Sequence, residues 1–310
     1  MEDKLTFELP LLEMEEKIRL LVEKEGETKN TAKLTLLLKK KEEEIYQNLT
    51  PWQVVQLARY QGRPRSLDYI NMIFESFLEL HGDRRFGDDP AIVGGLAFFN
   101  KHTVMVIAQQ KGRGVDDNLF RRFGMPYPEG YRKAQRLMRL AEKMKIPLIT
   151  LVDTPGAFPG IESEERGQAE AISLSISLML SLQIPTVAVV IGEGGSGGAL
   201  ALASADKILM LKYSIFSVIS PEGCAAILWK DEKYAEKAAG ELKLTARDLW
   251  KLKIIDVIIE EPLRGAHYHP EQVARNISDS LSHHLNLLRS LPLDTLVQLR
   301  KEKYLKIGKL

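Results

Sequence analysis

A pattern that occurs twice, 38 residues apart, limits the folds that are open to this sequence. Residues 145–147 (Lys-Ile-Pro) open one short apolar run, and residues 183–185 (Gln-Ile-Pro) open the next. Each run leads into a glycine-containing loop and then a segment with helical periodicity, so that Gly156 falls on Gly194. Because a period of this length is typical of stacked supersecondary units, we predict strand–loop–helix units that cover one another's apolar faces.

Strands and helices are predicted to alternate from residue 91 onward. Two β-branched runs separated by residues 100–102 (Asn-Lys-His) predict a hairpin, and the alternation after it predicts a parallel sheet with crossover helices. Ser163 can cap the helix of the first repeat, and Glu164 and Glu165 suit the positive N-terminal end of that helix. The expected strands are 92–99, 103–108, 148–152, 186–191, 208–211, 215–218 and one within 252–259, and the expected helices include 134–141, 169–180, 221–229 and a long C-terminal helix from Pro270.

The first 48 residues are rich in charge and almost free of glycine and proline. Apolar residues at helical spacing on both sides of Gly26 predict a helical hairpin, and breaks at residues 50–51 and 62–64 predict short helices after it. We therefore divide the chain into an N-terminal helical arm, residues 1–65, and a body, residues 66–310. Two interpretations of the arm remain open, namely packing against the body and binding of a partner.

The composition excludes several classes of protein. A net charge of +1 gives no overall field that would attract nucleic acid or an anionic membrane. The longest apolar run, residues 184–191, is far shorter than the ~20 residues of a transmembrane helix, and residues 1–10 lack the apolar core of a signal peptide. Cys224 is the only cysteine, so neither an intrachain disulfide nor a cysteine zinc motif can form. We expect a cytoplasmic protein that binds no nucleic acid, membrane or metal.

Residues 192–199 (GEGGSGGA) concentrate glycine between a buried strand and a helix. Glycine is costly in chain entropy, so a requirement of the backbone must explain this run. The N–H groups of such a loop, together with the positive end of the next helix, suit an anion or a developing oxyanion, and a tight turn is the other explanation. The run is not a dinucleotide fingerprint, because the next helix has room for about two turns and no acidic residue ends the following strand. It is not a Walker A loop either, because no Lys-Ser/Thr comes after it.

The same run also fits a nucleophile elbow, in which Ser196 occupies the centre of G-x-S-x-G. Asp256 and His267 come after it in the order that α/β-hydrolases use. The glycines around Ser196 would hold its side chain poorly, and the triad rests on chain order alone. A serine hydrolase is therefore the alternative function.

Several motifs together resemble one enzyme family. Residues 151–160 (LVDTPGAFPG) are similar to the first active-site loop of the biotin-dependent carboxyltransferases, and residues 192–199 are similar to the second. Along nearly its whole length the chain resembles the alpha subunits of the carboxyltransferase component of bacterial-type acetyl-CoA carboxylase. Residues 164–168 (EERGQ) and 217–225 (SVISPEGCA) are similar to stretches particular to those subunits, and residues 80–84 (LHGDR) and 261–267 (EPLRGAH) add to the resemblance.

This resemblance implies an α/β fold of the crotonase type, a spiral of repeated ββα units, here with an N-terminal helical extension. It implies an α2β2 heterotetramer with the carboxyltransferase beta subunit, which works with a biotin carboxyl carrier protein and a biotin carboxylase. The implied reaction transfers the carboxyl group from N1-carboxybiotin, carried on the separate carrier protein, to acetyl-CoA. The product is malonyl-CoA, and the reaction is the first committed step of fatty acid biosynthesis.

The resemblance also implies roles for particular residues. The N–H groups of Gly197 and Gly198 are expected to form a catalytic oxyanion hole for the biotin oxygen, while the beta subunit is expected to hold the enolate. The basic residues at 111–113 and 121–122 are either a site for CoA phosphates or a solvated charge cluster. The remaining expected site residues are Gly194 and Gly195, which would shape the loop, and Gly156 and Ala157, which would line the pocket.

Overall fold

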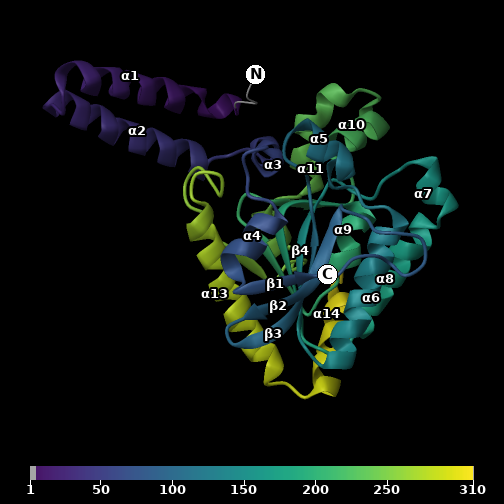
Figure 1. The fold of residues 1–310 in the computed structure, drawn as a ribbon. Coiled ribbons are helices and arrows are strands. Elements are labelled where there is room, and N and C mark those ends of the chain that lie inside the picture. The colour runs from purple at the N-terminus through teal and green to yellow at the C-terminus, as the bar shows by residue number, and fades with distance from the viewer. Residues whose placement is uncertain (1–4, 310) are drawn as a thin grey trace.

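A mixed sheet of eight strands forms the centre of the computed structural model, which describes residues 5–309 (Figure 1). The strand order is β1-β2-β3-β4-β5-β6-β8, and β7 pairs with the end of β5. The β1–β2 and β2–β3 pairs are antiparallel and the others are parallel, which confirms the predicted hairpin and parallel sheet. Predictions on residues 1–4 and 310 lie outside the described residues. The strands are β1 (Ser76–Glu79), which no sequence pattern predicted, β2 (Ile92–Phe99), β3 (His102–Gln109), β4 (Leu148–Thr154), β5 (Thr186–Gly195), β6 (Lys207–Leu211), β7 (Ile215–Ser217) and β8 (Val257–Ile259).

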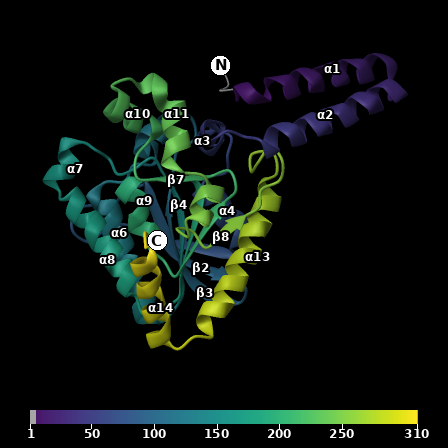
Figure 2. The same ribbon diagram turned by 180° about the vertical axis from the view of Figure 1, so that it is seen from behind.

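Helices cover both faces of this sheet, because side chains alternate along its central strands. In β3, Met105 and Ile107 contact one apolar layer. Val104, Val106 and Ala108 contact the other. The first layer includes side chains of α6, α8 and α9, the second includes those of α4 and α13, and the two sets lie on opposite sides of the sheet (Figure 1 and Figure 2). These helices are α4 (Ser66–Ile73), α6 (Pro128–Met144), α8 (Gln168–Ser181), α9 (Ser196–Ala203) and α13 (Pro270–Arg289).

Local sequence signals explain where several helices begin. The helices α6, α10 and α13 each start with proline, whose fixed φ suits the first turn. The hydroxyl of Ser220 accepts a hydrogen bond from the Gly223 N–H and caps α10. The predicted helices from residues 221 and 270 are thus confirmed. The other short helices are α3 (Pro51–Arg59), α5 (Gly114–Phe120), α7 (Ile161–Glu165), α10 (Pro221–Trp229), α11 (Ala235–Leu242), α12 (Ala246–Lys251), η1 (Thr6–Glu8), η2 (Arg122–Gly124) and η3 (Glu232–Tyr234).

Both repeats contain the predicted strand, loop and helix, but the first contains two helices instead of one. Gly167, at φ 80°, separates α7 from α8. Ser163 lies inside α7 and is buried, and no side chain caps the start of α8. The prediction that Ser163 caps the helix of the first repeat is wrong, because a left-handed glycine turns the chain before the longer helix begins.

The N-terminal segment forms the predicted helical hairpin, α1 (Leu9–Glu25) and α2 (Lys29–Gln47), which extends away from the body (Figure 1 and Figure 2). Gly26, at φ 74°, lies in the turn between the helices. The foot of the arm packs against the body through the buried side chains of Leu11 and Tyr46. Towards the tip, Leu20 and Leu36 are 52% and 56% exposed. Partner binding by the arm stays a prediction, as does the boundary after residue 65.

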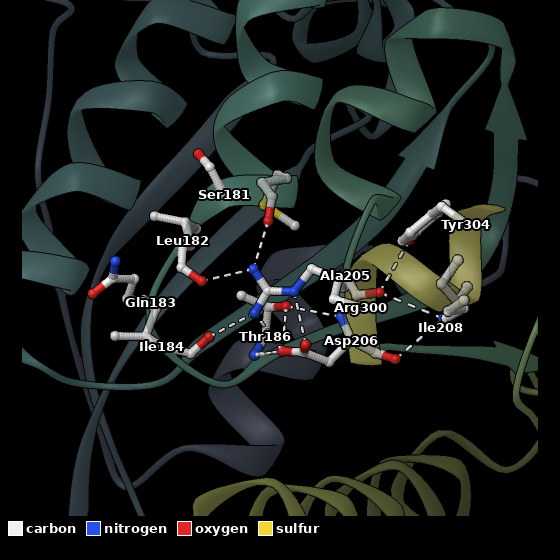
Figure 3. Close-up of polar contacts among 12 residues, drawn as sticks. Ser181, Leu182, Gln183, Ile184, Thr186, Ala205, Asp206, Ile208, Arg300 and Tyr304 are labelled. Carbon is white, nitrogen blue, oxygen red and sulfur yellow. Dashed lines mark hydrogen bonds and ion pairs between the residues drawn. The ribbon is translucent and has the colours of Figure 1, made fainter. Parts of the chain in front are cut away.

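The last helix, α14 (Leu293–Lys306), had no counterpart in the sequence predictions. Its anchor is Arg300, whose side chain is 0% exposed. The guanidinium pairs with Asp206 at 2.7 Å and donates to the carbonyl oxygens of Leu182 and Ile184 at 2.7 and 2.9 Å (Figure 3). The helix therefore covers the edge of the sheet where β5 and β6 begin.

Candidate active site

The glycine-containing loops of the two repeats meet at the carboxyl ends of β4 and β5. A Cβ atom on Gly195 would stand 2.0 Å from the Pro155 carbonyl oxygen. A Cβ atom on Gly198 would stand 2.7 Å from the Ala157 nitrogen and 2.8 Å from the Gly156 carbonyl carbon. These distances are too short for any side chain, so the close approach of the two loops requires glycine at both positions. Four of the six predicted site residues therefore lie in one contact between the loops.

The other two predicted glycines flank this contact. Gly194 pairs with Thr154 of β4 and Phe216 of β7, and a Cβ atom on it would stand 2.8 Å from the Phe216 ring. Gly197 is less confined, because the nearest atom to a Cβ there is Ile172 Cγ2 at 3.3 Å. The structure therefore gathers all six residues, while the chemical role of each stays a prediction.

The N-terminus of α9 provides the hydrogen-bond donors of this region. Strand β5 runs directly into α9, and the N-cap residue, Gly195, has no side chain that could cap the helix. The first N–H groups of a helix have no acceptor within the helix, and the helix dipole makes this end positive. Ser196 begins the helix at φ 53° and is exposed, and Gly197 and Gly198 complete the first turn. Such a turn is suited to an anionic oxygen.

A layer of buried charge lies beside the glycine run, and the sequence motifs gave no sign of it. The Lys111 ammonium, just after β3, lies 2.9 Å from Asp153 Oδ1 and 3.1 Å from Glu193 Oε2. Arg59, the last residue of α3, donates to Glu193 Oε1 at 2.8 Å and to Glu222 Oε1 at 2.6 Å. The only available signal was that Lys111, Asp153 and Glu193 each lie at or just beyond the carboxyl end of an apolar run, which places them at the same edge of the sheet.

Opposite charges keep the buried carboxylates of this layer ionised. Burial by itself would raise the pKa of Glu193, but the positive charges of Lys111 and Arg59 hold the pKa below its usual value. The pKa of Asp153 is likewise lowered, because Lys111, Arg65 and the Glu193 N–H outweigh its burial. The site thus carries balanced charge beside its backbone donors.

The basic residues at 111–113 and 121–122 are paired with acids of the same chain. Arg113 lies 2.6 Å from Asp68, and Arg121 lies 2.9 Å from Asp117. Arg122 pairs with the buried carboxylate of Asp89. Because these charges are already neutralised, the structure favours a charge cluster at this position over a site for CoA phosphates.

The residues of the alternative hydrolase triad lie in separate parts of the molecule. Asp256 accepts from the Ile208 N–H at 2.7 Å and pairs with Lys303, at the start of β6. Ile208 is the partner of Ala188 in β5, and Ser196 comes eight residues after Ala188. At ~3.3 Å per residue, about 26 Å separates Ser196 from this end of the sheet.

His267 belongs to the foot of the arm. Its ring lies 4.7 Å, between centroids, from each of Tyr60 and Tyr268, and its Nε2 atom is 4.0 Å from Glu8. Asp256, at the opposite edge of the sheet, is hydrogen-bonded elsewhere. The serine hydrolase interpretation is therefore wrong, because residues in the right order along the chain have been placed at opposite ends of the parallel strands.

Large apolar side chains are exposed on the two helices that follow β3 and β7 at this edge. Val115 and Phe120 of α5 are 75% and 61% exposed, and Ile227 and Leu228 of α10 are 65% and 61% exposed. Groups of exposed apolar side chains are typical of surfaces that bind other proteins. In residues 5–309, no helix is both long and apolar enough to cross a bilayer.

The chain resembles proteins of one family along almost its whole length. The model of the family described as acetyl co-enzyme A carboxylase carboxyltransferase-like matches residues 4–308. A protein of Geobacter metallireducens, named acetyl-coenzyme A carboxylase carboxyl transferase subunit alpha, is 52% identical over 310 residues, which cover 99% of this chain and 98% of that one. A protein of the same name from Thermus thermophilus is 52% identical over 316 residues, with 98% of both chains covered.

Solved structures with the same arrangement of strands and helices show the fold class. A chain of a Pseudomonas malonate decarboxylase hetero-tetramer in complex with coenzyme A matches with a TM-score of 0.60 and 17% identity, over 76% of this chain and 91% of that one. Transcarboxylase 12S matches with a TM-score of 0.58 and 20% identity, over 71% of this chain and 41% of that one. These similarities confirm the predicted α/β, crotonase-like fold.

Proposed function

The chain belongs to the acetyl co-enzyme A carboxylase carboxyltransferase-like family, and we propose on this basis that the N-terminus of α9 binds the oxygen of the carboxyl donor during carboxyl transfer. The chain is a transferase subunit of acetyl-CoA carboxylase, as its relatives of about 50% identity are.

The proposed substrates are carboxybiotin, carried on a separate carrier protein, and acetyl-CoA. Bound carboxybiotin supplies the carboxyl group and, through the ureido group left behind, the base that takes the methyl proton of the thioester. The chain then needs to stabilise a negative oxygen, for which backbone N–H groups at a helix N-terminus are suited. We assign this task to Gly197 and Gly198.

The observation that carries this assignment is the uncapped first turn of α9 against the first loop. Gly195 and Gly198 allow the contact with residues 155–157, so the donors lie at the junction of both repeats. Ser196 is exposed beside them, but the His267 ring packs on Tyr60 and Tyr268, and Asp256, the acid that a triad would need, lies at the other end of β5. Gly156 and Ala157 are proposed to line the pocket from the first loop.

The second half of the site is proposed to come from a carboxyltransferase beta subunit. The relatives are named alpha subunits, which implies a complex of several subunits, and the exposed apolar side chains of α5 and α10 offer a surface for such a partner. The proposed assembly is α2β2, served by a biotin carboxyl carrier protein and a biotin carboxylase. A cytoplasmic location is part of this proposal.

The test is reconstitution of the reverse reaction, carboxylation of biocytin by malonyl-CoA. We expect no turnover by the purified chain alone and turnover when the beta subunit of the same organism is added. Full turnover by the isolated chain would reject a shared site. Ser196→Ala is expected to keep at least half of the kcat of the complex, and a fluorophosphonate probe is expected not to label the wild-type chain.

A further inference from the structure

The strand that leads into the glycine run is locally displaced where it passes Asp153. Val152 pairs with Val190 and Thr154 pairs with Gly194, so one residue of β4 stands opposite three residues of β5. Asp153 Oδ1 accepts from the Glu193 N–H at 3.0 Å across this bulge. A Cβ atom on Gly192 would stand 2.6 Å from the same oxygen. The Asp153 carboxylate thus contacts the backbone of β5 at the place where its regular pairing with β4 is interrupted.

Glu193 is held in this bulge from two further sides. The Lys111 ammonium lies between Asp153 and Glu193 and so joins the two loops through one cation. The side chain of Arg59 reaches from α3 to Glu193 and continues to Glu222, the second residue of α10. The side chains of Lys111, Asp153 and Glu193 are at most 10% exposed.

Stability alone does not explain so many buried charges. Desolvation of an ion pair cancels most of its attraction, and apolar side chains of similar volume often stabilise a fold at least as well. What charged groups add is a defined position, because each hydrogen bond restricts direction as well as distance. Glu193 precedes the donor Gly197 by only four residues, and no loop lies between them, because β5 ends at Gly195 and α9 begins at Ser196.

We propose that Glu193 is a positioning residue for carboxyl transfer, whose carboxylate, held between Lys111 and Arg59, fixes the end of β5 and with it the direction of the Gly197 and Gly198 N–H groups. The inference rests on the proposed function, since it needs those groups to be the donors. Arg59 extends the same chain of contacts to α10, whose exposed apolar face is proposed to meet the partner subunit. Ordering of the loop and docking of the partner are then linked through one guanidinium.

The experiment uses the reconstituted complex with its beta subunit and measures kcat and KM for biocytin in the malonyl-CoA assay. Glu193→Gln keeps the size of the side chain but removes its charge. We expect kcat to fall at least tenfold with KM changed less than threefold, because donors that are misdirected lose most of their effect in the transition state. Size-exclusion mass is measured on each complex, so that only assembled protein is compared.

A matched control separates positioning from simple loss of a buried carboxylate. Asp206→Asn removes the charge of another buried acid, which Arg300 and Thr186 hold at the opposite edge of the sheet. We expect this variant to melt at a lower temperature but to keep kcat within twofold in the assembled complex. An equal loss of kcat in both variants would overturn the inference.

A second pair of variants keeps the inference testable if Glu193→Gln does not fold. Arg59 is 29% exposed, so its replacement is less disruptive. We expect Arg59→Met to lower kcat at least fivefold and Arg59→Lys, which restores a cation beside Glu193, to recover at least half of it. Wild-type kcat in the assembled Arg59→Met complex would overturn the inference. An inactive wild-type complex would instead reject the proposed function, so the two failures are distinguishable.

Discussion

Gly197 and Gly198 are neighbours at the start of α9, yet they are glycine for different reasons. At Gly198 a Cβ atom would overlap the backbone of the first loop and stand 2.8 Å from the Tyr131 hydroxyl oxygen. At Gly197 the nearest atom is Ile172 Cγ2 at 3.3 Å, which can give way slightly. A branched residue at 198 would therefore disturb the fold, whereas one at 197 would meet a side chain only. Position 197 is the better place to test the donors.

We predict that Gly197→Val lowers kcat of the reconstituted complex by ~10²–10³, because a branched side chain beside the N–H groups displaces the oxygen that they bind. The melting temperature and the mass of the complex should change little, because the atom that a Cβ at position 197 would meet, Ile172 Cγ2 at 3.3 Å, belongs to a side chain and not to the backbone. The measurements are the malonyl-CoA and biocytin assay, thermal melting and size-exclusion mass.

The comparison variant is Gly198→Ala, for which we expect a clear fall in melting temperature, because its Cβ atom meets backbone. Near-wild-type turnover of a well-assembled Gly197→Val complex would contradict the assignment of the donors. A melting temperature reduced as much as that of Gly198→Ala would show that Gly197, too, is required by packing.

The helical arm, α1 and α2, is joined to the body by a compact polar cluster around Arg264. Arg264, whose side chain is 7% exposed, lies 2.7 Å from Glu15 of α1 and also pairs with Glu42 of α2. Neither ring nitrogen of His267 has a hydrogen-bond partner among the described residues. Burial, aided by the nearby charges of Arg63 and Arg264, lowers the pKa of His267 to about 4. The foot of the arm therefore contains an imidazole that stays neutral.

This arrangement predicts that the chain loses stability as the pH falls from 7 to 5. The unfolded chain binds a proton at His267 near its ordinary pKa of 6.5, while the folded chain binds it only near 4. Within this window acid therefore favours the unfolded chain, and the loss is complete below pH 4. The contribution of His267 between pH 7 and pH 5 is about 2 kcal/mol.

We expect urea titrations of His267→Phe to show a free energy of unfolding that falls by about 2 kcal/mol less over this range than that of the wild type. His102→Phe, at the exposed first residue of β3, should leave the pH dependence unchanged. Glu8 acts in the opposite sense, because burial raises its pKa, but it is present in all three proteins. If the free energy of unfolding falls equally with pH in the wild type and in His267→Phe, this would be evidence against a buried neutral imidazole.

In the molecule as a whole, the carboxyl and amino ends of the parallel strands form two edges of the sheet with different roles. The carboxyl edge carries the glycine loops, and the amino edge is covered by α14. The Arg300 guanidinium connects three segments there, since it reaches Met179 and Leu182 at the end of α8, Ile184 before β5 and Asp206 before β6 (Figure 3). Arg300 thus fixes the amino ends of β5 and β6, at the edge of the sheet opposite the glycine loops.

We predict that Arg300→Met lowers the free energy of unfolding by about 3–5 kcal/mol, because it leaves Asp206 buried without its cation. Thermal melting is the measurement, and Lys306→Met, at a side chain that is 74% exposed, is the control with little expected effect. The double variant Arg300→Met/Asp206→Asn should be more stable than Arg300→Met alone. If the double variant is less stable than Arg300→Met, then lost packing, and not an unpaired charge, is responsible for the loss of stability.

Elements with local signals could be predicted from the amino-acid order alone. The strands at 92–99 and 186–191, the helices that begin at Pro221 and Pro270 and the turn at Gly26 result from periodicity, proline and glycine, which act over a few residues. The glycine run was recognised for the same reason, because no other residue type allows backbone to approach backbone so closely.

The surroundings of that run depend instead on long-range contacts, which only the folded chain reveals. Lys111 follows β3, Asp153 lies in β4 and Glu193 lies in β5, and no pattern within any one of these segments shows that a single ammonium joins them. Arg300 looks like a surface residue of a charged helix until Asp206 is placed beside it. Ser196, Asp256 and His267 stand in the order of a triad, but β5 separates two of them by its full length. Chain order carries no information on distance, because contacts between charges depend on which strands become neighbours and on the ends at which their side chains meet.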